Sequence, residues 1–115
     1  MSPLPNFKPS RGQALRAKHA AKLEEARQLA ALYRAVYKRD GYRCVVCHRH
    51  VVVGSPEELK RAHPHHITPR SLAKRLVLTL SNVVTVCPFC HADIGDRTLV
   101  IEGNADTGLQ IRRVA

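Results

Sequence analysis

Two cysteine pairs and a group of histidines are the residues of this chain whose types and spacing can do chemistry. The segments 44–47 and 87–90 have the sequences CVVC and CPFC and together hold all four cysteines of the chain. Two residues between cysteines allow a tight turn that aims both sulfurs at one point, and four thiolates satisfy a tetrahedral zinc ion. We therefore expect a structural Zn²⁺ held by Cys44, Cys47, Cys87 and Cys90.

Histidines fill and flank the segment between the two pairs. Residues 63–66 have the sequence HPHH, and His91 directly follows the last cysteine. Successive residues of a strand point to opposite sides, so His65 and His66 can have different roles, one holding a metal and the other facing a water. Residues 48–86 form a longer insertion than the roughly 15–20 residues of a compact zinc ribbon. His63 has three interpretations: a support for another ligand, a substitute ligand, or a loop residue before Pro64.

The charge of the chain indicates a polyanionic partner. Lysine and arginine number 19 against nine acidic residues, a formal net charge of +10 with an isoelectric point near 10.1. Zinc with four bound thiolates would lower this charge to about +8, since metal binding deprotonates the ligands. Few aromatic residues are available to stack on bases, so we expect DNA binding through phosphates, with little sequence preference and a steep salt dependence.

The first residues and the hydropathy pattern indicate where in the cell the protein is expected. Residues 1–9 contain three prolines and are interpreted as a flexible leader, with no apolar run suited to a signal peptide. No later stretch approaches membrane-spanning length. We expect a cytoplasmic protein that does not contact a membrane, where paired cysteines bind metal more often than they form disulfides.

A basic helix is expected over residues 10–40. Ser10 and Gln13 have the spacing of a capping box, an apolar stripe runs from Leu15 to Tyr37, and the helix should end near residues 40–41. Its first turns carry cations that oppose the helix dipole, namely Arg11, Arg16, Lys18 and Lys22. Two interpretations stay open: these side chains contact phosphates, or they form a solvated face of a helix that packs by its stripe.

The rest of the chain alternates strand and helix patterns. Residues 51–53 predict a short strand and residues 56–62 a short helix with Pro56 in its first turn. Brief strands are predicted at 65–68 and 83–86, and a short helix runs from Pro88 to Ile94. Residues 99–101 and 109–111 predict a terminal hairpin. The fold class is therefore α+β, in one small zinc-stapled domain.

Three segments together resemble a known family. The runs 39–47 (RDGYRCVVC), 65–69 (HHITP) and 82–91 (NVVTVCPFCH) closely resemble the HNH endonucleases with a four-cysteine zinc site, over roughly residues 33–95. The resemblance implies a ββα-metal (His-Me finger) fold. The expected organisation is a leader (1–9), the basic helix (10–40), the nuclease core with its zinc site (41–97) and the C-terminal hairpin (98–115).

The resemblance also implies roles for single residues. His66 occupies the position of the general base, and Asn82 that of the residue that braces the loop and orients the base. His65 and His91 occupy positions that hold the catalytic divalent ion. Some relatives have a further histidine where this chain has Gly95, so the expected site is two histidines completed by water.

The ion and the reaction follow from these positions. His65 stands where the family often has aspartate, as in the colicin-type nucleases, and imidazole favours Zn²⁺, Ni²⁺, Co²⁺ or Mn²⁺ over Mg²⁺. Mg²⁺ is retained as a candidate because phosphate and water oxygens can complete its shell. The implied activity is DNA hydrolysis, with nicking expected and 5′-phosphate and 3′-hydroxyl ends, and phosphate contacts are assigned to Arg70, Arg75 and Arg97.

Two other functions compete with this one. A non-catalytic zinc-stapled DNA-binding module would share the charge and the cysteines, but it has no use for three histidines around a second metal. A c-type dihaem protein would use two CxxCH motifs, at residues 44–48 and 87–91, but it leaves Asn82 and the paired histidines unexplained.

The resemblance extends to source and partners. Small HNH proteins of this layout are encoded by bacteriophages or bacteria, and some phage versions resemble partners of the DNA-packaging terminase. A phage terminase is thus an expected partner at the level of the family, although the sequence itself shows none. We expect a monomer or a weak dimer.

Overall fold

The structure is a computed structural model that describes residues 8–114, so most of the leader at residues 1–9 lies outside the described part. Helix α1 spans Arg11–Arg39. The Oγ of Ser10 accepts a hydrogen bond from the backbone N–H of Gln13 at 3.1 Å, and the Gln13 side chain accepts one from Ser10 N–H at 2.7 Å. The predicted capping box is therefore confirmed, and the helix ends at Asp40 as expected.

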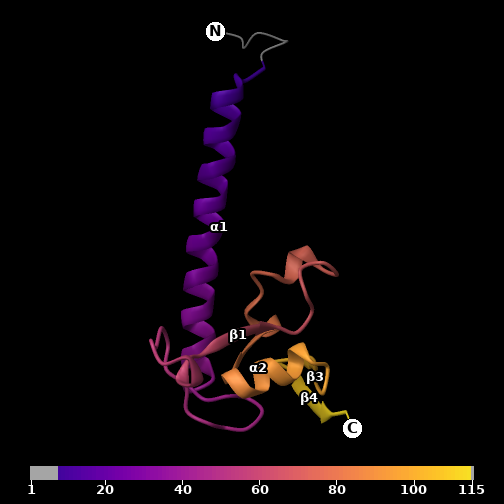
Figure 1. Cartoon of the computed structure of the whole chain (residues 1–115). Helices are drawn as coiled ribbons and strands as arrows, with labels where there is room; N and C mark the ends of the chain where they lie inside the picture. Colours follow the sequence, from indigo (N-terminus) through magenta and orange to yellow (C-terminus); the bar gives the residue numbers. More distant parts are fainter. Residues whose placement is uncertain (1–7, 115) are drawn as a thin grey trace.

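Most of α1 extends away from the remainder of the protein (Figure 1). Its buried residues are Val36 and Tyr37, both in the last turns, whereas Leu15 is 59% exposed and Leu23 is 45% exposed. The apolar stripe predicted from Leu15 onward therefore packs only at its C-terminal end. No helix in the described part of the chain combines the length and apolarity needed to cross a membrane.

Two consecutive residues anchor the end of α1. The guanidinium of Arg39 donates hydrogen bonds to the carbonyl oxygens of Leu80, at 2.8 Å, and Val83, at 2.6 Å. The carboxylate of Asp40 accepts a hydrogen bond from Thr85 N–H at 2.9 Å and pairs with the Arg39 side chain. These bonds fix the base of the helix against the strand Val83–Val86.

The centre of the domain is a β-hairpin followed by a helix. Strand β1 (His63–His66) pairs antiparallel with β2 (Val83–Val86), with His63 opposite Val86 and His66 opposite Val83. Helix α2 (Pro88–Gly95) follows after Cys87, its N-cap residue. The predicted α+β class is confirmed. The first strand begins two residues earlier than expected and ends at His66, so His63 is a strand residue and its interpretation as a loop residue is wrong.

The segment between the first cysteine pair and β1 differs from its prediction. Residues 51–53 form only an isolated bridge, between Val52 and Arg61, and residues 56–62 contain one 3₁₀ turn, Glu58–Lys60, in place of an α-helix. Ser55 Oγ accepts a hydrogen bond from Glu57 N–H, two residues on, but the single 3₁₀ turn is all that follows it. Both the strand at 51–53 and the helix at 56–62 were therefore wrong.

A C-terminal hairpin completes the core. Strands β3 (Leu99–Asn104) and β4 (Gly108–Arg113) pair antiparallel, which confirms the predicted hairpin with longer strands. Leu99 and Ile101 are buried and pack with Val84, Val86 and the buried cysteines. The core of this small domain therefore surrounds the cysteine cluster.

Candidate functional site

The four cysteines converge on one point. Cys44 follows the turn after α1, Cys47 lies in the next turn, and Cys87 and Cys90 occupy the cap and first turn of α2. All four sulfurs lie within 4.8 Å of one another, and those of Cys47 and Cys87 are 3.6 Å apart. A tetrahedral zinc site with Zn–S bonds near 2.3 Å requires sulfur separations of about 3.8 Å. The donor set and spacing therefore fit the predicted structural metal site.

Backbone groups support the same cluster. The N–H groups of Val46 and Cys90 point at the sulfurs of Cys44 and Cys87, each at 3.4 Å. Burial raises the pKa of the Cys87 and Cys90 thiols, so a metal that binds there displaces protons. Since both CxxC pairs serve one site, the geometry disagrees with two separate haem attachments.

The histidines of β1 divide between the two faces of the hairpin. Alternation along the strand places His63 and His65 on one face and His66 on the other. The ring of His63 stacks on that of His91 from α2, with centroids 4.6 Å apart and planes 3° from parallel. Burial and the nearby His91 and His66 lower the pKa of His65, which favours the neutral ring that binds metals. His63, His65 and His91 therefore gather on the face of the hairpin that α2 covers.

His66 is held by groups from outside the hairpin. Its Nε2 lies 3.0 Å from the carbonyl oxygen of Val77, and its ring meets Tyr33 of α1 edge-on with centroids 6.0 Å apart. A carbonyl oxygen only accepts hydrogen bonds, so this contact places the proton on Nε2 and leaves the lone pair on Nδ1. The arrangement supplies a ring with a fixed orientation and one nitrogen able to accept a proton.

Asn82 ties down the loop that carries Val77. This buried residue accepts a hydrogen bond from Thr68 N–H at 2.8 Å and donates to the carbonyls of Thr68 and Leu76 at 3.0 and 3.1 Å. Thr68 follows His66 by two residues, and Leu76 precedes Val77. Asn82 therefore closes the loop 67–77, whose last residue, Val77, contacts the His66 ring through its carbonyl oxygen.

A basic groove lies beside this loop. It has a volume of about 540 Å³ and is lined by Glu25 of α1 and by Arg70, Lys74, Arg75, Val77 and Leu78. Arg70 donates to Glu25 at 2.7 Å across the groove. Val77 lines the groove and its carbonyl oxygen contacts His66, so one residue links the groove to the general-base candidate.

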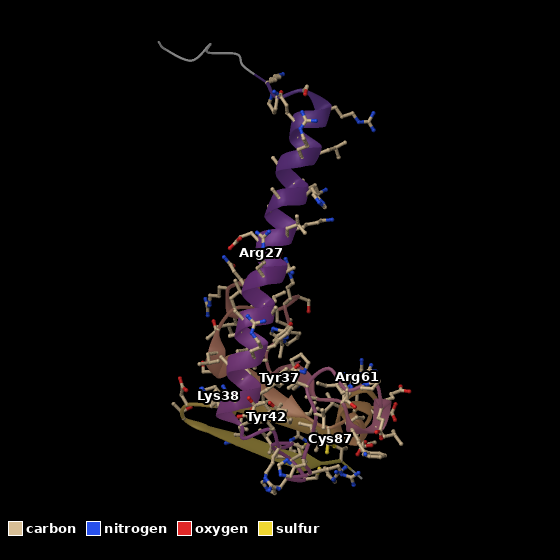
Figure 2. All side chains as sticks on the ribbon, turned by 90° about the vertical axis from the view of Figure 1, so that its left-hand side faces the viewer. Arg27, Tyr37, Lys38, Tyr42, Arg61 and Cys87 are labelled. Atoms are coloured by element: carbon tan, nitrogen blue, oxygen red, sulfur yellow. The ribbon has the colours of Figure 1, made fainter. Side chains whose placement is uncertain are left out.

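The remaining predicted cations are spread more widely. Arg97 follows α2 in a left-handed conformation with φ of 63° and is exposed. Arg11, Arg16, Lys18 and Lys22 lie on the far part of α1, remote from the hairpin and α2 (Figure 1). In Figure 2 the first turns of α1, well before Arg27, stand clear of the domain, while Cys87 lies inside it. The structure therefore does not bring the helix cations into the histidine site.

Sequence reasoning missed several residues of the site. Val77 acts through its backbone carbonyl, which no side-chain pattern reveals. Tyr33 belongs to the predicted apolar stripe of α1, and neither Lys74 nor Glu25 lies in a recognisable sequence motif. A cluster of basic residues at 70–75 was the one available sign of the groove.

Comparison with known proteins identifies one family. The model of the HNH endonuclease family matches residues 44–97, a segment that contains the four cysteines, strand β1, Asn82 and His91. No curated protein and no solved structure matches the chain.

Proposed function

Residues 44–97 form an HNH endonuclease domain, and from this premise we propose that the protein is a metal-dependent DNA endonuclease that nicks with little sequence specificity. The observation that carries the proposal is the fixed orientation of His66. Its Nε2 is committed to the Val77 carbonyl, its Nδ1 has no hydrogen-bond partner among the described residues, and a basic groove adjoins the same loop. A DNA-binding module without catalysis has no need of a histidine held in this way.

Phosphodiester hydrolysis needs an activated water, neutralisation of charge at the phosphate and stabilisation of the leaving 3′ oxygen. We assign the first task to His66, whose Nδ1 accepts the proton of the attacking water. Asn82 and Val77 hold the ring in place for this transfer. The products expected of the reaction are 5′-phosphate and 3′-hydroxyl ends.

A divalent ion held by His65 and His91, when bound, supplies the charge neutralisation at the phosphate and the leaving oxygen. Two neutral imidazoles are borderline ligands, which favours Mn²⁺, Ni²⁺, Co²⁺ or Zn²⁺, while Mg²⁺ requires more oxygen donors from water and phosphate. The four-cysteine cluster is assigned to Zn²⁺, since four thiolates select soft or borderline metals.

The route of the DNA is proposed to follow the basic groove and continue along α1. Arg70, Lys74 and Arg75 line the groove beside the loop that positions His66. On α1, Lys18 and Lys22 precede the groove residue Glu25 by seven and three residues, so all three lie on one face of the helix. A duplex in the groove would therefore meet Lys18 and Lys22 further along its backbone. Arg11, seven residues before Lys18, lies on the same face of the helix, whereas Arg16 lies on the opposite face.

The test is a cleavage assay on supercoiled plasmid with the zinc-loaded protein and each of Mn²⁺, Ni²⁺, Co²⁺, Zn²⁺ and Mg²⁺. A monomer with one histidine site cuts one strand at a time, so we expect nicked circles that a DNA ligase can seal. Linear product at early times would indicate that a dimer cuts both strands. DNA binding without cleavage under every metal would contradict the proposal and support the non-catalytic binding module.

The cations of distal α1 should strengthen DNA binding without taking part in the chemistry. We expect the triple variant Arg11→Gln, Lys18→Gln and Lys22→Gln to bind DNA at least about tenfold more weakly at low salt. The slope of log K against log salt should fall by about 0.9 for each lost phosphate contact. Cleavage of bound DNA should be unchanged. Removing cations near a helix N-terminus relieves an unfavourable interaction with the dipole, so the helix itself stays intact.

The matched control removes the same amount of charge from ion pairs elsewhere. Lys60, Arg112 and Arg113 are exposed and paired with Glu57, Glu102 and Asp93. Changing these three to glutamine should alter DNA affinity much less, as measured by fluorescence anisotropy over a range of salt. Equal losses in the two triple variants would show that net charge alone, and not the position along α1, determines binding.

A further inference from the structure

His63 has no role in the reaction as proposed, yet it makes the closest described ring contact to a metal-ligand candidate. Its ring lies face to face with that of His91, with centroids 4.6 Å apart and an angle of 3° between the planes. His63 is half-buried in β1, where its backbone pairs with Val86, whereas His91 is exposed on α2. A half-buried ring fixed in a strand therefore packs against an exposed ring on the helix.

The parallel arrangement indicates that His63 is not itself a ligand. An imidazole binds a metal through a lone pair in the plane of its ring, at about 2.0–2.1 Å. Two rings stacked in parallel planes aim their lone pairs along separate planes and do not converge on one ion. Among residues 8–114, the four cysteines are the one group of three or more ligating side chains close enough to share a metal. The contact of His63 with His91 is thus a packing contact.

Helix α2 offers His91 no other support on its exposed side. Gly95 lies four residues after His91, one turn further along the same face, and it has no side chain. A Cβ placed at Gly95 would meet no atom within 4 Å, so that side of His91 is open. Among the described residues, the stack with His63 is the aromatic contact of the His91 ring, and it limits rotation of that ring.

We propose that His63 is a positioning residue that holds the His91 ring by stacking and so orients it to bind the divalent ion. The inference rests on the proposed function, because it assumes that His91 is a ligand of that ion. Stacked aromatic pairs contribute energies that correspond to roughly a two- to tenfold change in a binding constant. The stack should therefore raise affinity for the second metal by about this factor.

The experiment compares His63→Ala, which removes the stack, with His63→Phe, which keeps a stacking ring but has no nitrogen. The protein is first loaded with zinc at the cysteine site and then titrated with Ni²⁺ by calorimetry. We expect His63→Ala to weaken the second site about two- to tenfold and His63→Phe to stay within about twofold of the original. His19→Ala, a change at an exposed histidine of α1, controls for weak binding by surface histidines.

The stack also has a direct signature that needs no second metal. A ring lying face to face with His91 shifts the His91 ring protons upfield in the NMR spectrum of the zinc-loaded protein. This shift should persist in His63→Phe and disappear in His63→Ala. Both variants should keep the melting temperature of the original to within a few degrees.

Three results would contradict either the positioning role of His63 or the ligand role of His91. Equal loss of Ni²⁺ affinity in His63→Phe and His63→Ala would mean that the His63 nitrogen binds the ion, and it would overturn the positioning role. Unchanged affinity and unchanged ring shifts in His63→Ala would overturn it as well. Retention of the second site in His91→Ala would instead reject His91 as a ligand, which is a failure of the proposed function.

Discussion

The variant His66→Ala is expected to lose DNA cleavage while it keeps its fold, its zinc and its affinity for DNA. General acid–base catalysis by a positioned side chain contributes about 10²- to 10⁴-fold to a rate, and alanine leaves no group at this position to accept the proton of water. The substitution leaves the groove cations and the four cysteines in place, so DNA affinity and zinc content should be unaffected. A time course of plasmid nicking measures the loss, together with anisotropy for DNA affinity and a zinc assay.

Two further variants show whether the loss is specific to the proton acceptor. His50→Ala removes an exposed histidine of the first cysteine turn and should leave cleavage unchanged. Asn82→Ala should slow cleavage for a different reason, because it frees the loop 67–77 that carries the Val77 carbonyl. It should also lower the melting temperature, since it leaves the backbone groups of Thr68 and Leu76 without their partner. His66→Ala should lose less stability, because it leaves one carbonyl, that of Val77, without its partner, whereas Asn82→Ala removes three hydrogen bonds. Full turnover in His66→Ala would reject the assignment of the base.

Local patterns predicted those parts of the site that are built by neighbours in sequence. The strand Val83–Val86 is a β-branched run, α2 begins at a proline after a capping residue, and the two CxxC turns are set by their own spacing. Each of these is determined within a few residues. The placement of His65, His66 and His91 on the hairpin and its helix follows from the same elements.

Other features of the site and the fold depend on contacts between residues that are distant in sequence, and these features were not predicted. The orientation of His66 is fixed by the carbonyl of Val77, eleven residues away, and by Tyr33 of α1. Val51 to Val53 have strand propensity, but only a single bridge forms, between Val52 and Arg61, a pairing with a residue nine positions away that local propensity does not reveal. The apolar stripe of α1 correctly predicted a helix, but periodicity does not indicate how much of that helix packs against the rest of the protein.

The second large effect is expected from Cys90→Ser, which should unfold the domain or leave it with little stability. Cys90 is 2% exposed and packs with Val84, Val86 and Leu99 around the cluster. Structural zinc binding contributes about 10–16 kcal/mol of apparent free energy in small zinc domains, compared with a total stability of about 5–15 kcal/mol for ordinary domains. Loss of one of four thiolates therefore weakens a term that is as large as the whole stability. Circular dichroism melting and a zinc stoichiometry assay measure the outcome.

Removal of the metal from the unaltered protein should reproduce the effect of Cys90→Ser. A strong chelator, or acid that protonates the thiolates, is expected to abolish the thermal transition, and returned Zn²⁺ should restore it. Ala92→Ser, an exposed substitution on the same helix, controls for the presence of serine in α2 and should melt as the original does. A normal melting temperature for Cys90→Ser would show that the cluster does not hold the fold. Because His91 follows Cys90 directly, loss of the cluster should also abolish binding of the second metal, whereas His66→Ala should leave both metals bound.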